Sequence, residues 1–266
     1  MFTFLLKRFY QAVIVMFVIS LVAFSIQDNL GDPLRELVGQ SVSESVRQEL
    51  RDKMGLNDPF LVKYSRFLQN AVQGDLGTSY FFKRPALEVI LDKLVATLEL
   101  VFAAALIIVV VSIPLGVYSA IRPRSFLTKL IMAVSSIGIS IPVFLTAIML
   151  MYLFSIQLGW LPAYGRGETY NLLGWESGFF TWDGILHLIL PAVSLSSIML
   201  PLFIRLVRSE MLEQLSSEYV KFARAKGLDN NKVYYQHALK NTMLPVITVG
   251  GVQIGTMVAY TILTET

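Results

Sequence analysis

Cysteine is absent from this 266-residue sequence, and charged residues are scarce. The lack of cysteine excludes disulfides, zinc–thiolate sites, iron–sulfur ligation and a catalytic thiol. Charged residues make up 15% of the chain and hydrophobic residues 55%, a balance that favours a membrane protein over a soluble one. The net charge of +3 does not indicate nucleic acid as a partner, because the basic residues stand beside the ends of apolar runs, where anionic lipid accounts for them.

Motifs for nucleotide, metal or acyl-transfer chemistry are also absent. The sequence has no GxxxxGK[ST] phosphate loop, no HExxH and no GxSxG. His187 and His237 are isolated, and structural roles are expected for both rather than catalysis or metal binding. A membrane-embedded enzyme would need a cluster of polar catalytic groups, which the sequence lacks. We therefore expect no enzymatic activity, no metal site and no cofactor bound by this chain.

Long apolar runs predict transmembrane helices. The run at 100–121 has no charged residue, and at about 1.5 Å per residue it reaches roughly 30 Å, the thickness of a bilayer's hydrocarbon core. A cleaved signal peptide is the alternative for the first run, but residues 25–28 offer no small-x-small cleavage site, which favours an uncleaved span. The predicted fold is an all-α polytopic membrane protein with five visible spans, at 9–26, 100–121, 130–158, 185–204 and 243–264.

Basic residues between the spans predict their orientation. Seven Lys or Arg residues lie between Arg205 and Lys240, whereas the loop at 159–183 has one Arg and three acidic residues. Positive residues mark the cytoplasmic side, so a cytoplasmic amino terminus and a cytoplasmic 205–242 loop are expected. The predicted organisation is a first span with the amino terminus at 1–27, an extracytoplasmic segment at 28–96 and a transmembrane domain at 97–266.

The extracytoplasmic segment is expected to contain two helices. A capping box predicts one at 41–55, and a second is expected at 58–74, capped by Asp58 and ended by Gly74. An apolar stripe on the second helix predicts a small local core, with partner contact as the alternative. The stripe consists of Leu61, Tyr64, Leu68 and Val72.

The predicted spans contain essentially no Asp, Glu, Lys or Arg away from their ends, and Glu99 and Glu265 both stand near the outer boundary. A proton- or sodium-driven carrier usually places such a group inside the membrane, because the coupling ion needs a site. A secondary carrier or channel is therefore the less favoured alternative. The pattern indicates that energy enters from a partner.

Prolines and small polar residues occur inside the spans instead. Internal prolines bend helices, which suits a gated pathway. Gly251 and Gly255 have the GxxxG spacing that lets two membrane helices approach closely, so helix packing is expected there. The residues expected to line a translocation pathway are Ser136, Ser140, Gln253 and Thr256.

Residues 218–245 interrupt the apolar pattern with a helix, a break and a second helix. Tyr219, Phe222, Ala223 and Lys226 follow helical spacing and predict one apolar face, Gly227 predicts the break, and Asp229 is expected to cap the second helix. The alternative is a basic amphipathic helix on lipid headgroups. A short helix held between two spans fits a partner's groove better. The second face is outlined by Val233, Tyr234, His237, Ala238 and Asn241.

An ordered set of fragments runs through nearly the whole chain. They are "GDP" after the first span, "MGLNDPFLVKY", "GDLGTSY", "ATLEL", "GISIPVF", "LGWLPAYG", "HLILPAVSL", "EYVKFARAKGL" and "HALKNTMLPVIT". With this set the chain resembles the inner-membrane permease subunits of binding-protein-dependent ABC importers, in the dipeptide, oligopeptide and nickel branch.

The resemblance implies that the 205–242 loop docks on an ATPase subunit through a Glu-Ala-Ala…Gly pattern. Gly227 matches the glycine and Ala223 the second alanine, but Lys221 and Phe222 stand where the family has Glu and the first Ala. Glu218 is the candidate replacement for that glutamate. The residues expected to form the ATPase-coupling loop are Glu218, Tyr219, Lys221, Phe222, Ala223, Arg224, Gly227, Leu228 and Asp229.

The resemblance also implies an assembly in the bacterial cytoplasmic (inner) membrane. Its parts are this multi-pass permease, a homologous second permease, two ATP-binding subunits or domains that hydrolyse ATP with Mg²⁺, and an extracytoplasmic solute-binding protein. The implied cargo is a di- or oligopeptide, with nickel or glutathione-type uptake as alternatives. A sixth span is expected after "TILTET" at residues 261–266.

Overall fold

The computed structural model describes residues 2–29, 48–49, 51–52, 55–79, 81–172 and 175–265. Four helices in these ranges are long and apolar enough to cross a membrane, or five if one sharply bent helix pair counts as a single span. The predicted all-α polytopic class is confirmed, with two short β-hairpins added. The predicted helix at 41–55 lies mostly outside the described residues. The chain forms two compact units, Met1–Asp92 and Lys93–Thr266, which are described separately.

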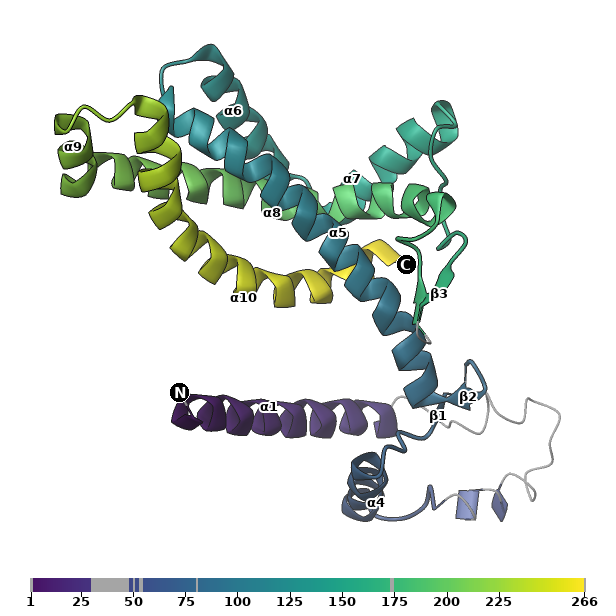
Figure 1. Ribbon diagram of the computed structural model, residues 1–266. Helices are drawn as coiled ribbons and strands as arrows, with labels where there is room; N and C mark the ends of the chain where they lie inside the picture. Colours follow the sequence, from purple (N-terminus) through teal and green to yellow (C-terminus); the bar gives the residue numbers. More distant parts are fainter. Residues whose placement is uncertain are drawn as a thin grey trace. The chain divides into compact units, whose positions relative to one another are not determined.

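The first unit contains a long helix, α1 (Phe2–Asn29), and a short one, α4 (Phe60–Val72) (Figure 1). Tyr64 is buried where they pack, and its hydroxyl lies 2.8 Å from the hydroxyl of Ser20. The ring of Phe24 lies 5.5 Å from the rings of both Tyr64 and Phe67, measured between centroids. An aromatic cluster therefore joins the two helices.

The predicted details of α4 are partly wrong. Leu61 and Val72, placed on the apolar stripe, are 74% and 89% exposed, because the face that packs on α1 carries the aromatic rings instead. Asp58 does not cap the helix: its carboxylate pairs with Arg66 at 2.6 Å. Gly74 follows the helix at φ +86°, a backbone conformation that glycine adopts easily, as predicted for a stop.

A hairpin of β1 (Thr78–Ser79) and β2 (Arg84–Pro85) precedes α5 (Ala86–Ile121). The second unit is built around α8 (Trp182–Ser216), against which α6, α7 and α10 pack (Figure 1). Gly116 of α5 lets α5 and α8 approach closely, because a β-carbon at this position would lie 2.6 Å from the β-carbon of Val207 in α8. The remaining elements of the unit are α6 (Phe126–Ser140), α7 (Val143–Leu150), the π-helix η1 (Met151–Gln157), the hairpin β3 (Tyr170–Leu172) and β4 (Trp175–Ser177), α9 (Glu218–Ala225), the π-helix η2 (Lys232–Ala238) and α10 (Leu239–Glu265).

The predicted third span, 130–158, is not one continuous helix. It breaks between α6 and α7, and the two parts are bent by 107°. Ile141 leaves the helical conformation at φ −94° and ψ 123°, as expected for a residue that precedes proline. The hydroxyl of Ser194 donates to the carbonyl of Val143 at 3.2 Å, which ties the first turn of α7 to α8.

The other prolines lie inside continuous helices. Pro114 belongs to α5, Pro191 and Pro201 to α8, and Pro245 to α10. The last span was predicted to begin at residue 243, but α10 already begins at Leu239. Within the described residues, the only bent helix pair that could form one span is the pair broken at Pro142.

Candidate coupling site

The polar stretch at residues 217–238, called the coupling segment from here on, stands on a buried apolar base. α8 continues beyond the apolar run to Ser216 and carries Met211, which is fully buried. Val220 of α9 and Val233 of η2 are also fully buried and belong to the same apolar cluster. The hydroxyl of Thr242 in α10 lies 3.6 Å from the Met211 sulfur. The segment is therefore packed onto two long helices.

Gly227 ends α9 in a Schellman turn. Its amide donates to the carbonyl of Arg224 at 2.9 Å, and the amide of Leu228 donates to the carbonyl of Ala223 at 3.3 Å. Gly227 has φ +77°, and a β-carbon there would meet no atom within 4 Å. The glycine is required by the backbone conformation and not by a lack of space.

Asp229 begins the second helical part. Its carboxylate accepts the amide of Asn231 at 3.0 Å, and its carbonyl accepts the amide of Val233 at 3.0 Å. The predicted cap is therefore present in the structure. The π-helix η2 follows at once and was not predicted, because a one-residue expansion of a helical turn leaves no distinct hydrophobic period.

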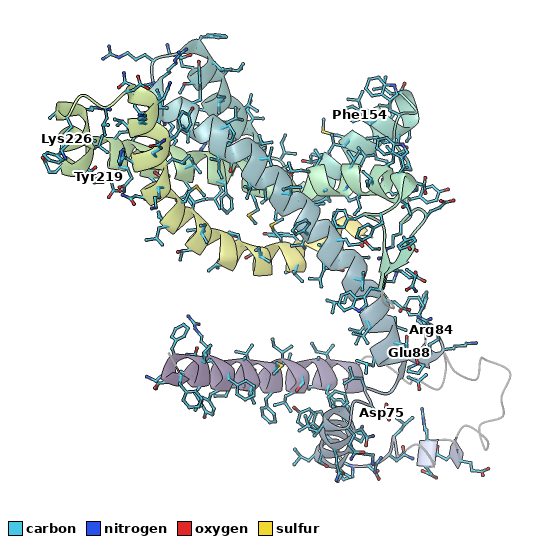
Figure 2. The ribbon with its side chains drawn as sticks, in the orientation of Figure 1. Asp75, Arg84, Glu88, Phe154, Tyr219 and Lys226 are labelled. Atoms are coloured by element: carbon cyan, nitrogen blue, oxygen red, sulfur yellow. The ribbon has the colours of Figure 1, made fainter. Side chains whose placement is uncertain are left out.

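The predicted apolar face of α9 is wrong by part of a turn. Val220 and Ala223 are buried, whereas Phe222 is 61% exposed and lies on the outer side. The ammonium of Lys226 lies 4.5 Å from the centre of the Phe222 ring, so the two side chains form an exposed cation–π pair. Figure 2 labels Tyr219 and Lys226 in this part of the chain. The two faces of α9 therefore differ: one is buried against the rest of the unit, and the other is exposed.

Three other polar residues of α9 have hydrogen-bond or ion-pair partners. Lys221 pairs with Glu218 at 2.8 Å, and the hydroxyl of Tyr219 donates to the side-chain carbonyl of Gln214 at 2.8 Å. Glu218, Lys221, Arg224 and Leu228 are all exposed. The coupling role of the predicted residues stays a prediction. The sequence pattern did not indicate Val220 and Met211, whose burial depends on helices that meet only in the fold.

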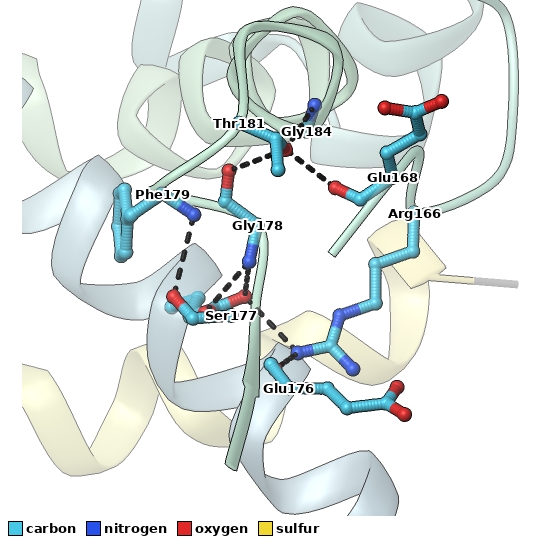
Figure 3. A network of polar contacts seen from close by, with 9 residues as sticks. Arg166, Glu168, Glu176, Ser177, Gly178, Phe179, Thr181 and Gly184 are labelled. Carbon is cyan, nitrogen blue, oxygen red and sulfur yellow. Dashed lines mark hydrogen bonds and ion pairs between the residues drawn. The ribbon is translucent and has the colours of Figure 1, made fainter. Parts of the chain in front are cut away.

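A second polar site lies at the other end of α8, around the carboxylate of Glu99. Figure 3 shows Arg166, Glu176 and Gly178 of this site. Glu99 belongs to α5, is 8% exposed and lies 3.2 Å from the guanidinium of Arg166. The amide of Gly178 donates to the same carboxylate at 3.1 Å. Arg166 also donates to the backbone carbonyl of Glu176. Glu99 thus ties the loop before α8 to α5.

The start of α8 is tied to the same loop. Thr181 caps the helix by accepting the amide of Gly184 at 3.0 Å and donates to the carbonyl of Glu168 (Figure 3). The carboxylate of Asp183 accepts the amide of Glu168 at 2.8 Å, and His187 hydrogen-bonds the carbonyl of Asp183 at 2.8 Å. His187 therefore has a hydrogen-bonded structural role, as expected.

Comparison with known proteins matches both parts of the chain to transport families. Residues 112–266 match the family described as "Binding-protein-dependent transport system inner membrane component", and residues 1–101 match its companion, "Binding-prot-dependent transport system membrane comp, N-term". The chain belongs to this family. It is an inner-membrane permease component of an ABC importer, and a permease component is not itself a catalytic subunit.

Curated relatives align with this permease over its full length. It is 34% identical to the "Dipeptide transport system permease protein DppB" of Alkalihalophilus pseudofirmus, with 100% of this chain and 84% of the relative covered. It is 36% identical to the "Oligopeptide transport system permease protein AppB" of Bacillus subtilis, and 36% identical to the "Di/tripeptide transport system permease protein DppB" of Pseudomonas aeruginosa. Each of these two alignments covers 100% of this chain and 83% of the relative.

The residues predicted to line a pathway do not form one cluster in the permease. Ser136 accepts a hydrogen bond from Arg205 at 2.7 Å, and Ser140 donates to the Ser136 carbonyl at 3.4 Å within α6. Gln253 and Thr256 are half-buried on α10. Their role as pathway residues stays a prediction.

The glycines predicted to pack helices contact no other helix of the permease in the described part of the chain. β-Carbons added at Gly251 and Gly255 would meet no atom within 4 Å. A β-carbon added at Gly250 would lie 3.8 Å from the ring of Phe203. Packing of helices through the GxxxG spacing therefore stays a prediction.

Proposed function

We propose that this permease is one membrane subunit of an ATP-driven importer that moves di- or oligopeptides across the bacterial cytoplasmic membrane. The names of the three relatives, which refer to dipeptides, oligopeptides and di/tripeptides, support peptides as the cargo. The proposed partners are a homologous second permease, two ATP-binding subunits and an extracytoplasmic solute-binding protein. The amino terminus and the coupling segment face the cytoplasm.

The observation that carries the proposal is the division of the coupling segment into an anchored face and an exposed face. The buried face packs on α8 and α10 through Val220, Ala223 and Val233. A partner that displaces the exposed face would therefore also displace these two long helices. Phe222 supplies an exposed aromatic ring, a side-chain type that is enriched at protein interfaces, and Lys226 places a cation beside it. The docking residues are thus Phe222 and Lys226, with Lys221 and Glu218 beside them.

Reconstitution tests the proposal directly. The permease is purified together with the proposed second permease and ATP-binding subunits and is reconstituted into proteoliposomes. The coupling segment faces the lumen, which contains ATP and Mg²⁺. Uptake of a radiolabelled dipeptide is expected to require ATP, the binding protein and an intact ATPase site, and to resist a protonophore. Uptake that persists without ATP and collapses with a protonophore would identify a secondary carrier instead.

Competition in the same vesicles tests the cargo. A tenfold excess of unlabelled dipeptide is expected to suppress the signal, whereas free nickel and glutathione are expected to leave it unchanged. Suppression by glutathione or transport of a nickel chelate, with no effect of dipeptides, would move the assignment to that cargo.

A further inference from the structure

Two arginines on α8 face α6 without an acidic partner. Arg205 donates to the hydroxyl of Ser136 at 2.7 Å, and Arg208 lies 3.7 Å from the sulfur of Met132. Neither guanidinium forms an ion pair with any carboxylate in the ranges that the structure describes. Both cations are met only by neutral acceptors, and a thioether is a weak one.

The hydrogen bonding of Arg208 is also incomplete. Its Nε atom is buried and has no hydrogen-bond partner in the described part of the chain. A guanidinium met only by neutral acceptors lacks a counter-charge, so the arrangement favours an anion near the accessible nitrogens of the two guanidiniums, although Arg208 Nε itself is too buried to be reached. Arg205 is exposed and Arg208 half-buried, which leaves these groups open to a ligand.

The position of this pair points to the phosphate of a lipid. The two arginines are the first charged residues after the apolar run at 185–204, whose roughly 30 Å length matches the hydrocarbon core. They therefore lie at the depth of the headgroups on the side where basic residues gather. Leu202, one turn toward the membrane, and Ile139 of α6 are exposed apolar side chains.

We propose that Arg205 and Arg208, facing Ser136 and Met132, form a binding site for the phosphate of an anionic phospholipid such as phosphatidylglycerol. The guanidinium planes donate paired hydrogen bonds to phosphate oxygens, while the acyl chains run past Leu202 and Ile139. Lys129, exposed one turn before Met132 on α6, adds positive charge on the cytoplasmic side. The site joins the two helices through the lipid, independently of any transported cargo.

Native mass spectrometry of the purified permease complex tests this assignment. Titration with phosphatidylglycerol is expected to give tighter binding than titration with phosphatidylcholine. Replacing either arginine with glutamine should weaken phosphatidylglycerol binding about fivefold, and the double variant R205Q/R208Q about thirtyfold. The matched control is Arg124→Gln, an exposed arginine of the α5–α6 turn, which should leave the binding unchanged.

Further arms separate the possible ligands. Inorganic phosphate should not displace the lipid, because it lacks the acyl chains; displacement by phosphate would overturn the assignment to lipid. Equal affinity for the two lipids, or an equal loss in the Arg124→Gln control, would also overturn it. A double variant that keeps its lipid and loses peptide uptake would overturn it as well, since the arginines would then serve the cargo.

If the glutamine variants fail to fold, R205K/R208K is used. This variant keeps the charge and should bind phosphatidylglycerol with intermediate affinity, because the paired donors are lost.

Discussion

The carboxylate of Glu99 lies 3.2 Å from the guanidinium of Arg166, although the two residues are 67 positions apart in the chain. Glu99 is almost fully buried, and its carboxylate is otherwise met by the amide of Gly178. Breaking a buried ion pair from one side leaves the other charge without a partner. This pair therefore has greater consequences for stability than the exposed ion pairs of the chain.

Replacing Glu99 with glutamine is expected to destabilise the permease by about 2 kcal/mol, less than for a fully buried pair because Arg166 is partly exposed. Thermal unfolding in detergent, followed by intrinsic fluorescence, measures the change. The matched control is Asp92→Asn, which breaks the exposed pair with Arg84 and should cost no more than about 1 kcal/mol. Equal effects of the two substitutions would show that Glu99 has no special role in stability.

Replacing Gly227 with valine is expected to uncouple the permease from its ATPase. The left-handed φ of +77° is strained for a β-branched residue, so the Schellman turn between α9 and η2 should be lost. Peptide uptake and co-purification of the ATPase subunit should both fall at least tenfold. Gly227→Asn is the control, since asparagine tolerates this conformation and should retain most of the coupling. Normal uptake by the valine variant would contradict the docking assignment.

Replacing Phe222 with alanine separates docking from folding. Because the ring is exposed, the thermal stability of the permease should change by no more than about 0.5 kcal/mol. ATPase co-purification should nevertheless fall several-fold, as the ring and Lys226 form the exposed face. Val233→Ala provides the reverse case, with a loss of about 1–3 kcal/mol in stability because that side chain is fully buried. Unchanged ATPase binding by the alanine variant at 222 would place the docking face elsewhere.

Replacing Gly251 with leucine should leave the fold of this chain intact, because nothing lies within 4 Å of a β-carbon added at this position. If the GxxxG face packs against a helix outside the described residues, the substitution should reduce recovery of the second permease in pull-down experiments several-fold. Gly250→Leu, which would meet Phe203, is the contrasting variant and should lower thermal stability. Full recovery of the partner with leucine at 251 would remove packing as the role of that glycine.

The absence of cysteine makes the orientation directly measurable. Single cysteines introduced at Arg224 and Lys240 are expected to react with a membrane-impermeant maleimide in inside-out vesicles and not in intact spheroplasts. A cysteine at exposed Trp175 of β4 should show the reverse pattern. Labelling of position 224 in intact spheroplasts would overturn the predicted topology.

Local chemistry was predictable wherever one residue controls the backbone. Gly227 takes the left-handed turn and Asp229 caps the following residues, as expected. The face of α9 was not predictable, because Tyr219, Phe222 and Ala223 form a plausible apolar stripe when the helix is considered alone. In the fold, Val220 and Ala223 form the buried face of α9 instead and belong to the same apolar cluster as Met211.

By itself the sequence determined the class of the protein, because runs of about 20 apolar residues are stable only as helices in lipid. It also determined where the polar stretch at residues 217–238 interrupts the apolar runs, since polar residues cannot continue an apolar run. Only the tertiary structure decided that the third predicted span breaks at Pro142, that Glu99 meets Arg166 and that Arg205 meets Ser136. These relationships join residues far apart in the chain, and their geometry depends on how the helices pack, which no local pattern encodes.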